Sequence, residues 1–405
     1  MLTTSSEYDS KAFVERDAKL IKVCILTTSF PRRRGDLSGI FIASLTEQLQ
    51  KIGVEFDLVM PYEDGCQRDE KIHGASVHRF EYWFRAKWQR LASDSGVLAD
   101  LRSLSGRLQL PSFLFMYLMK ARKYVRQADV IHANWTFSGF IAVILGRRYH
   151  KPIVVTVHGS DAALIKQSKV LRFITRWILR RATKVIVVSR KLKDEITSIG
   201  VDGGNIVVIY NGVNTEIFCK SMKREHTRRI LWAGRMSTEK NLPTLIHAFK
   251  SVTTQMPDAT LTLLGDGDRR KEIESLIAAL GLSSEVYLPG FKSHTEVAEY
   301  MKQCDVFVLP SLSEGFPLTV IEAMAIGRPV VVAAVGALPE FIQHGENGYL
   351  VDPRDPGQLA TTLVDLLQDP CKRQKVGESA AHAVRQLSWD QIAEKTHRVY
   401  EEVIQ

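Results

Sequence analysis

Short runs of consecutive apolar, β-branched residues recur along the whole chain, and longer segments with a helical period separate them. The runs span residues 21–27, 55–60, 129–132, 153–158, 184–188, 229–232, 260–264, 305–309 and 329–333. Strands that are buried on both faces have this composition, which is typical of parallel sheets covered by helices on either side. The alternation therefore predicts βαβ units throughout the chain.

The alternation continues through both halves of a chain of 405 residues, which is too long for one typical hydrophobic core. We therefore expect an α/β fold with two Rossmann-like, doubly wound parallel-sheet domains that face a central cleft. We expect a disordered tail over residues 1–20 and an N-terminal domain over 21–218. A charged linker near 219–228 begins the C-terminal domain over 219–386, and a terminal helix covers 387–405. Doubly wound sheets bind ligands at the carboxyl ends of their strands, so functional residues should directly follow strands.

Positive charge is concentrated in the first half of the chain. Residues 1–215 hold 33 Lys and Arg against 20 Asp and Glu, whereas residues 216–405 hold 21 against 25. A basic half favours anionic partners, which include a membrane surface, a phosphorylated substrate and nucleic acid. A solvated basic surface is the alternative, and charge alone does not separate these.

The cysteines and the N-terminal residues bear on the cellular compartment. The five cysteines lie far apart and form no CxxC pair, which argues against a disulfide framework or a zinc site and for a reducing compartment. The first twenty residues carry four acids and no apolar run, so we expect a cytoplasmic protein without a secretory signal. No apolar stretch approaches the roughly 20 residues that a membrane-spanning helix needs.

The most informative segment follows the expected strand at 305–309, where Pro317 suits the first position of the next helix. Free N–H groups and the positive dipole end at a helix start bind phosphate, and Gly315 allows a close approach. Glu314 in the loop and Glu322 in the helix stand on either side, and carboxylates accept hydrogen bonds from sugar hydroxyls. The pattern predicts a phosphate site between two sugar-binding carboxylates. A capped helix with two surface acids is the alternative.

A second cluster follows the expected strand at 229–232 and contains Gly234, Arg235 and Lys240. The planar fork of Arg235 and the point charge of Lys240 suit a diphosphate. Cations in this position stabilise the charge that grows on a diphosphate as it leaves during group transfer. A basic surface loop, with an ion pair to Glu239, is the alternative.

Two segments of the N-terminal half also follow strands. The ring of His158 can donate a hydrogen bond to a sugar hydroxyl, and Asp161 can orient that ring or cap the next helix. Gly39 stands at the start of the first helix, where its backbone can approach a donor phosphate or an acceptor. A structural histidine and a mobile basic loop at Arg32–Arg34 are the alternatives.

Together these segments resemble the large retaining glycosyltransferase family 4, which has the GT-B fold of two Rossmann-like domains. The most specific part is the E-x7-E stretch from Glu314 to Glu322, and the resemblance covers about residues 21–403. The segments IHANW at 131–135 and TVHGSD at 156–161 look like those of members that build bacterial surface polysaccharides. The last helix resembles the family's terminal helix, which crosses back onto the first domain.

The resemblance implies a role for each candidate. Arg235 and Lys240 would bind the donor diphosphate, and Glu314 would contact the transferred sugar. Glu322 would hold the ribose, His158 would touch the sugar near its reacting carbon, and Asp161 would orient the acceptor or the sugar. The further donor-binding positions would be Gly39, Gly234, Gly290, Phe291, Gly315, Phe316, Pro317, Leu318 and Thr319.

The resemblance also implies a UDP-sugar or GDP-sugar as donor, retention of the anomeric configuration, and no cofactor. No side-chain nucleophile is obvious in the family, and the leaving phosphate is proposed to help deprotonate the acceptor. Asp266 and Asp268 match the DxD pattern of metal-dependent sugar transferases. That match is short and the remaining architecture needs no metal, so we expect none. Arg270 interrupts a GxGxxG fingerprint after Gly265.

The acceptor is the least constrained partner. Aromatic and basic residues mix over 80–90 and 113–126, and such segments can lie on anionic headgroups. We expect a lipid-linked or polysaccharide acceptor and peripheral contact with the inner face of the cell membrane, and no nucleic acid, because no nucleic-acid motif is present. Core helices with basic outer faces are the alternative. The other functions left open are a GT-B phosphorylase, an epimerase and a nucleotide-sugar-binding protein without catalysis.

Overall fold

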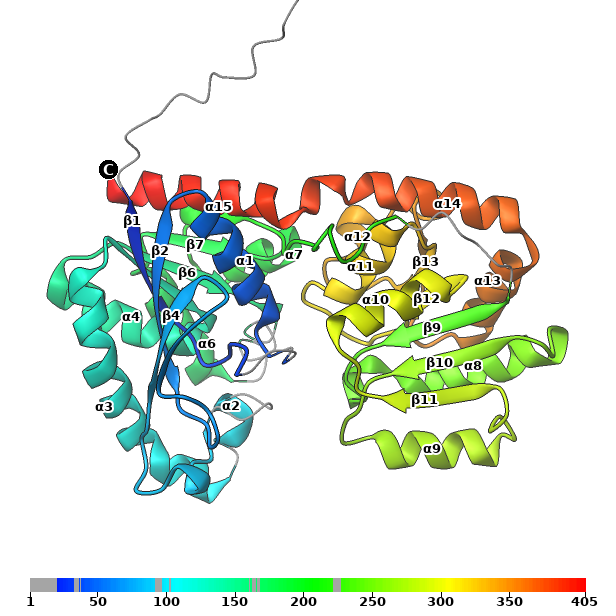
Figure 1. The fold of residues 1–405 in the computed structure, drawn as a ribbon, viewed down its shortest axis with the longest axis horizontal. Coiled ribbons are helices and arrows are strands. Elements are labelled where there is room, and N and C mark those ends of the chain that lie inside the picture. The colour runs from blue at the N-terminus through cyan, green and yellow to red at the C-terminus, as the bar shows by residue number, and fades with distance from the viewer. Residues whose placement is uncertain are drawn as a thin grey trace, which may run out of the picture.

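The computed structural model describes residues 20–32, 36, 38–91, 97–101, 103–159, 161, 165, 168–220 and 227–405. Within these residues the chain forms two parallel sheets that stand side by side, each with its own helices (Figure 1). The expected tail over 1–20 lies almost wholly outside the described residues, as do most of the linker near 219–228 and Arg33 and Arg34. The predicted domain limits stay a prediction.

The N-terminal half contains an eight-stranded sheet in the order β3-β4-β2-β1-β5-β6-β7-β8. Its strands are β1 (Ile21–Leu26), β2 (Val54–Pro61), β3 (Asp69–Ile72), β4 (Ala75–Phe80), β5 (Val130–Asn134), β6 (Ile153–Val157), β7 (Lys184–Val187) and β8 (Ile206–Val208). All neighbours pair in parallel except β3, which pairs antiparallel with β4 at the edge. Every residue of β5 and β6 is buried, as expected for strands covered on both faces.

The helices described in this half are α1 (Ile40–Lys51), α2 (Val97–Asp100), α3 (Leu104–Gln127), α4 (Trp135–Tyr149), α6 (Lys169–Leu179) and α7 (Arg190–Ser198). Serine side chains cap the starts of α3, α6 and α7 by accepting a backbone N–H, which explains where these helices begin. Helix α4 lies between α3 and α6 in one layer on the sheet.

The C-terminal half contains a six-stranded, fully parallel sheet in the order β11-β10-β9-β12-β13-β14. Its strands are β9 (Arg229–Ala233), β10 (Thr260–Leu264), β11 (Val286–Gly290), β12 (Val306–Leu309), β13 (Val330–Ala333) and β14 (Tyr349–Val351). Its helices are α8 (Leu242–Gln255), α9 (Arg270–Ala279), α10 (His294–Gln303), α11 (Leu318–Ile326), α12 (Leu338–Phe341), α13 (Pro356–Gln368) and α14 (Pro370–Ala383).

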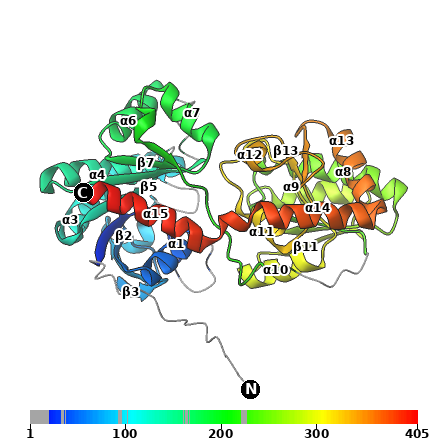
Figure 2. The ribbon, with the colours of Figure 1, turned by 90° about the horizontal axis from the view of Figure 1, so that it is seen from above.

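The last helix, α15 (Trp389–Ile404), leaves the C-terminal half and lies along the N-terminal half, where it packs beside α1 (Figure 2). A buried contact fixes it there, because His132 Nδ1 on β5 lies 2.6 Å from the Tyr400 hydroxyl. Within the described part of the chain, no helix is both long and apolar enough to cross a membrane.

Candidate active site

The carboxyl ends of the two sheets face each other across a cleft with a volume of about 910 Å³. Strand order reverses beside β1 and β5 in one sheet and beside β9 and β12 in the other, and ligands bind outside such reversals in doubly wound sheets. Six predicted donor-site residues line the cleft, namely Gly234, Arg235, Phe291, Leu318, Thr319 and Glu322. Gly39 is not on the wall itself, but its neighbours Ser38 and Ile40 are.

Lys240 and Glu314 form an ion pair at the cleft's inner edge. Lys240 ends the short 3-10 helix Thr238–Lys240, and its Nζ lies 2.7 Å from Oε1 of Glu314 in the loop between β12 and α11. The side chain of Glu314 is only 8% exposed, so the lysine neutralises a nearly buried carboxylate. Asn241 holds this turn in place, because its side-chain nitrogen donates to the carbonyl groups of Pro310 and Pro353.

The N-terminus of α11 opens onto the cleft through Leu318 and Thr319. Pro317 is the residue before the first helical residue, Leu318, whereas the sequence placed Pro317 at the first helical position. The ring of Phe316 turns to Tyr210 and Phe341, with ring centroids 5.4 and 5.5 Å away. Phe316 can therefore meet a ligand through its backbone, while its ring anchors the loop.

Glu322 is held by a residue that no sequence motif indicated, His294. The side chain of Glu322 is 6% exposed, and its Oε1 lies 2.7 Å from Nε2 of His294 at the start of α10. His294 also lines the cleft and packs edge-on against Phe218. The histidine thus fixes one carboxylate oxygen, and the other carboxylate oxygen can accept hydrogen bonds from a ligand.

His158 and Asp161 belong to a buried polar cluster at the end of β6. Nε2 of His158 lies 3.1 Å from Oδ1 of Asn134, and Asp161 accepts the His158 backbone N–H at 3.0 Å. Asp161 also accepts hydrogen bonds from the backbone and hydroxyl of Thr136. Burial, with a smaller contribution from His132, lowers the pKa of His158 to about 3, and burial raises the pKa of Asp161. The His158 ring is therefore neutral at physiological pH.

This cluster meets the opposite half through two glycines. A Cβ added to Gly159 would lie 2.5 Å from the Cα of Gly315, so the two backbones touch across the cleft. The contact brings the segment that carries His158 against the loop that carries Glu314. Lys240, Glu314, His158 and Gly315 do not line the main cavity; Gly315 lies where its two walls come together, next in the chain to Glu314, which pairs with Lys240.

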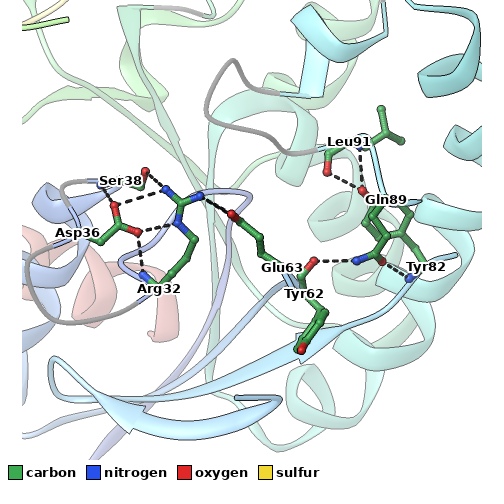
Figure 3. A network of polar contacts seen from close by, with 8 residues as sticks. All are labelled: Arg32, Asp36, Ser38, Tyr62, Glu63, Tyr82, Gln89 and Leu91. Carbon is green, nitrogen blue, oxygen red and sulfur yellow. Dashed lines mark hydrogen bonds and ion pairs between the residues drawn. The ribbon is translucent and has the colours of Figure 1, made fainter. Parts of the chain in front are cut away.

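Arg32 organises the N-terminal wall of the cleft (Figure 3). Its guanidinium bonds Asp36 at 2.6 Å, Ser38 at 3.0 Å and both carboxylate oxygens of Glu63 at 2.6 and 2.8 Å. These contacts raise the pKa of Arg32, first through Asp36 and then through Glu63. From the sequence, Arg32 was expected to belong to a mobile loop; in the structure its bonds to Asp36 and Glu63 join two loops.

The sequence comparisons match both halves of the chain. The model described as Glycosyltransferase Family 4 matches residues 38–217, and the model described as Glycosyl transferases group 1 matches residues 213–383. An uncharacterised glycosyltransferase of Methanocaldococcus jannaschii is 32% identical over 276 residues, which are 68% of this chain and 76% of that protein. The chain belongs to glycosyltransferase family 4. A D-inositol 3-phosphate glycosyltransferase of Corynebacterium diphtheriae is 26% identical over 90% of each chain.

Solved structures share the family's GT-B fold with this chain. A sucrose-phosphate synthase of Thermosynechococcus elongatus superposes with a TM-score of 0.80 at 24% identity, covering 94% of this chain and 98% of that one. The Anabaena protein HepE, solved with UDP-glucose, superposes with a TM-score of 0.73 at 21% identity, covering 94% and 100%. This glycosyltransferase therefore has the GT-B fold that the sequence predicted.

The described residues include no group of three or more His, Cys, Asp and Glu side chains arranged to hold a metal ion. Asp266, from the DxD-like segment, lines the cleft and pairs with Arg270 at 3.5 Å. Independence from metal stays a prediction.

Proposed function

We propose that this glycosyltransferase moves a hexose-type sugar from a UDP-sugar or GDP-sugar to a lipid-linked or polysaccharide acceptor, with retention of configuration and without a metal ion. The observation that carries the proposal is the composition of the cleft's C-terminal wall. There Arg235, the N-terminus of α11 and Glu322 line one cavity, next to the ion pair of Lys240 and Glu314. This set offers cations and helix N–H groups to a diphosphate, and carboxylates to hydroxyls.

Each side chain has a distinct task in this proposal. Arg235 and Lys240 bind the diphosphate and stabilise its charge as it leaves, with the free N–H groups at the start of α11. Glu322, oriented by His294, accepts hydrogen bonds from the ribose. Glu314 accepts hydrogen bonds from the transferred sugar, and His158 lies on the far side of that sugar. The HepE structure with UDP-glucose supports a nucleotide-sugar donor for a protein of this fold.

The test is a transfer assay that follows both products. Purified protein, a UDP-sugar or GDP-sugar and a lipid or glycan acceptor should release free nucleoside diphosphate in step with glycosylated acceptor, and chelators should not slow the reaction. Epimerisation of the donor without diphosphate release, or cleavage that requires inorganic phosphate, would favour the epimerase or phosphorylase alternative. Binding of donor without turnover by any acceptor would favour the non-catalytic alternative.

We further propose a cytoplasmic protein that works at the inner face of the cell membrane. Of the two segments expected to contact lipid, Phe80, Tyr82, Phe113 and Tyr117 are buried in the core, so these rings do not reach a membrane. The exposed large apolar side chains of these segments are Phe84, Trp88, Phe115 and Met119. The basic N-terminal half remains the support for this location.

A further inference from the structure

Helix α6 presents large apolar side chains to solvent beside a row of cations. Val170 and Phe173 are 66% and 69% exposed, and Ile174 is 39% exposed. These residues recur at helical spacing along one face, with Lys169, Arg172 and Arg176 next to them. A helix of a soluble domain normally turns such a stripe toward the core, but α6 buries only Thr175, Ile178 and Leu179.

Arginines at the end of α6 and directly after it surround a hollow together with α4. A pocket of about 430 Å³ is lined by Arg147 of α4 and by Phe173, Arg176, Trp177, Arg180 and Arg181. Arg181 is used within the protein, because it lies over the Trp177 ring and donates to its carbonyl. In the part of the chain that the structure describes, no carboxylate pairs with Arg147, Arg176 or Arg180, and residues 169–181 contain no Asp or Glu.

We infer that the outer face of α6, with Arg147 of α4, is a contact surface for a bilayer that carries anionic phosphate headgroups. The arginines around the pocket bind headgroup phosphates, and Val170, Phe173 and Ile174 enter the boundary between headgroups and acyl chains. A helix with an exposed apolar stripe and flanking cations binds a membrane surface in this way. The inference rests on the proposed function in one respect: a lipid-linked acceptor would explain why the enzyme binds a membrane.

Other occupants fit the same observations less well. A soluble phosphate would use the arginines but leave Val170, Phe173 and Ile174 exposed. A second copy of the chain would cover the apolar stripe but bring two rows of unpaired cations together. Stabilisation of the α4 and α6 dipoles explains cations near the helix ends, but not the apolar residues between them.

The test is sedimentation of the full-length protein with vesicles of phosphatidylcholine alone, and with vesicles in which one third is replaced by phosphatidylglycerol. Wild-type protein should bind the anionic vesicles, release them at high salt and ignore the neutral ones. The double variants R176Q/R180Q and F173S/I174S should each weaken binding about tenfold or more. As matched controls, Lys250→Gln with Lys271→Gln and Tyr287→Ser remove exposed charges and an exposed ring from the C-terminal half and should leave binding unchanged.

Four results would overturn the inference. The first two are equal binding of wild-type protein to neutral and anionic vesicles, and no binding to either. The third is binding of R176Q/R180Q and F173S/I174S to anionic vesicles as strong as that of the control variants. The fourth is a wild-type protein that binds no vesicles but forms a dimer in sedimentation velocity, which F173S/I174S abolishes. A thermal-shift measurement with inorganic phosphate separates a lipid headgroup from a soluble anion. If the arginines formed a site for a soluble anion, phosphate would raise the melting temperature of wild-type protein but not of R176Q/R180Q, and wild-type protein would not bind vesicles. Vesicle binding is measured without donor or acceptor, so its failure and the failure of sugar transfer are independent results.

Discussion

A single added methyl group at the contact between the two halves should separate sugar transfer from donor binding. In Gly159→Ala, the new Cβ would lie 2.5 Å from the Cα of Gly315, whereas carbon atoms normally approach to about 3.5–4.0 Å. The two walls of the cleft must therefore move apart by roughly 1 Å at this point. A displacement of about 1 Å near the reacting atoms costs on the order of 100-fold in rate.

The assay is steady-state transfer, followed by release of nucleoside diphosphate, together with a thermal-shift measurement of nucleotide binding. Gly159→Ala should lower kcat about 100-fold and leave nucleotide binding intact, because the proposed nucleotide contacts lie in the other half. Gly203→Ala is the matched control, since its Cβ would meet nothing closer than 3.8 Å. A Gly159→Ala protein that transfers sugar at the wild-type rate would refute the role we give to this contact.

Three further predictions concern single side chains. Lys240→Ala and Glu314→Ala should each lower kcat by about 100-fold or more with the circular dichroism spectrum unchanged; a wild-type rate in either would show the site assignment to be wrong. His294→Ala should raise the donor KM more than it lowers kcat, and His294→Gln, which keeps a donor for Glu322, should restore much of it; equal KM values in all three proteins would contradict the positioning role. Burial lowers the pKa of His132 from 6.5 to about 4, so the unfolded chain binds more protons between these values and stability falls as pH drops. Between pH 7.5 and 5.5, the free energy of unfolding measured with a chemical denaturant should fall by about 1 kcal/mol less in His132→Gln than in wild-type protein. The same pH dependence in both proteins would contradict this prediction.

The fold was predictable where burial on both faces leaves a mark on the sequence. The strands β5, β6, β12 and β13 are wholly buried, and each was predicted from its continuous apolar run. Strand β3 was missed because three of its four residues (DEKI) are charged and the strand lies at a sheet edge. Strand β11 also lies at an edge, and only the first of its residues Val286–Gly290 is buried, so it formed no continuous apolar run.

The candidate site was predictable where its chemistry lies in one short segment after a strand. Arg235, Glu322 and the start of α11 follow β9 and β12 in the chain and line one cleft. His294 gave no such signal, because it reaches Glu322 only through the packing of α10 against α11. The approach of Gly159 to Gly315 likewise depends on how the two halves meet, which no local pattern records.

The central claim is that the C-terminal wall of the cleft grips a nucleoside diphosphate, and direct binding tests it most simply. Purified protein should be heated with UDP, GDP and ADP, and with the matching monophosphates. We predict that one diphosphate raises the melting temperature by roughly 5 °C or more near saturation, that its monophosphate does so far less, and that the shift is lost in Lys240→Ala. If none of the three diphosphates shifts the melting temperature of wild-type protein, the C-terminal wall of the cleft does not bind a nucleoside diphosphate and the central claim is wrong.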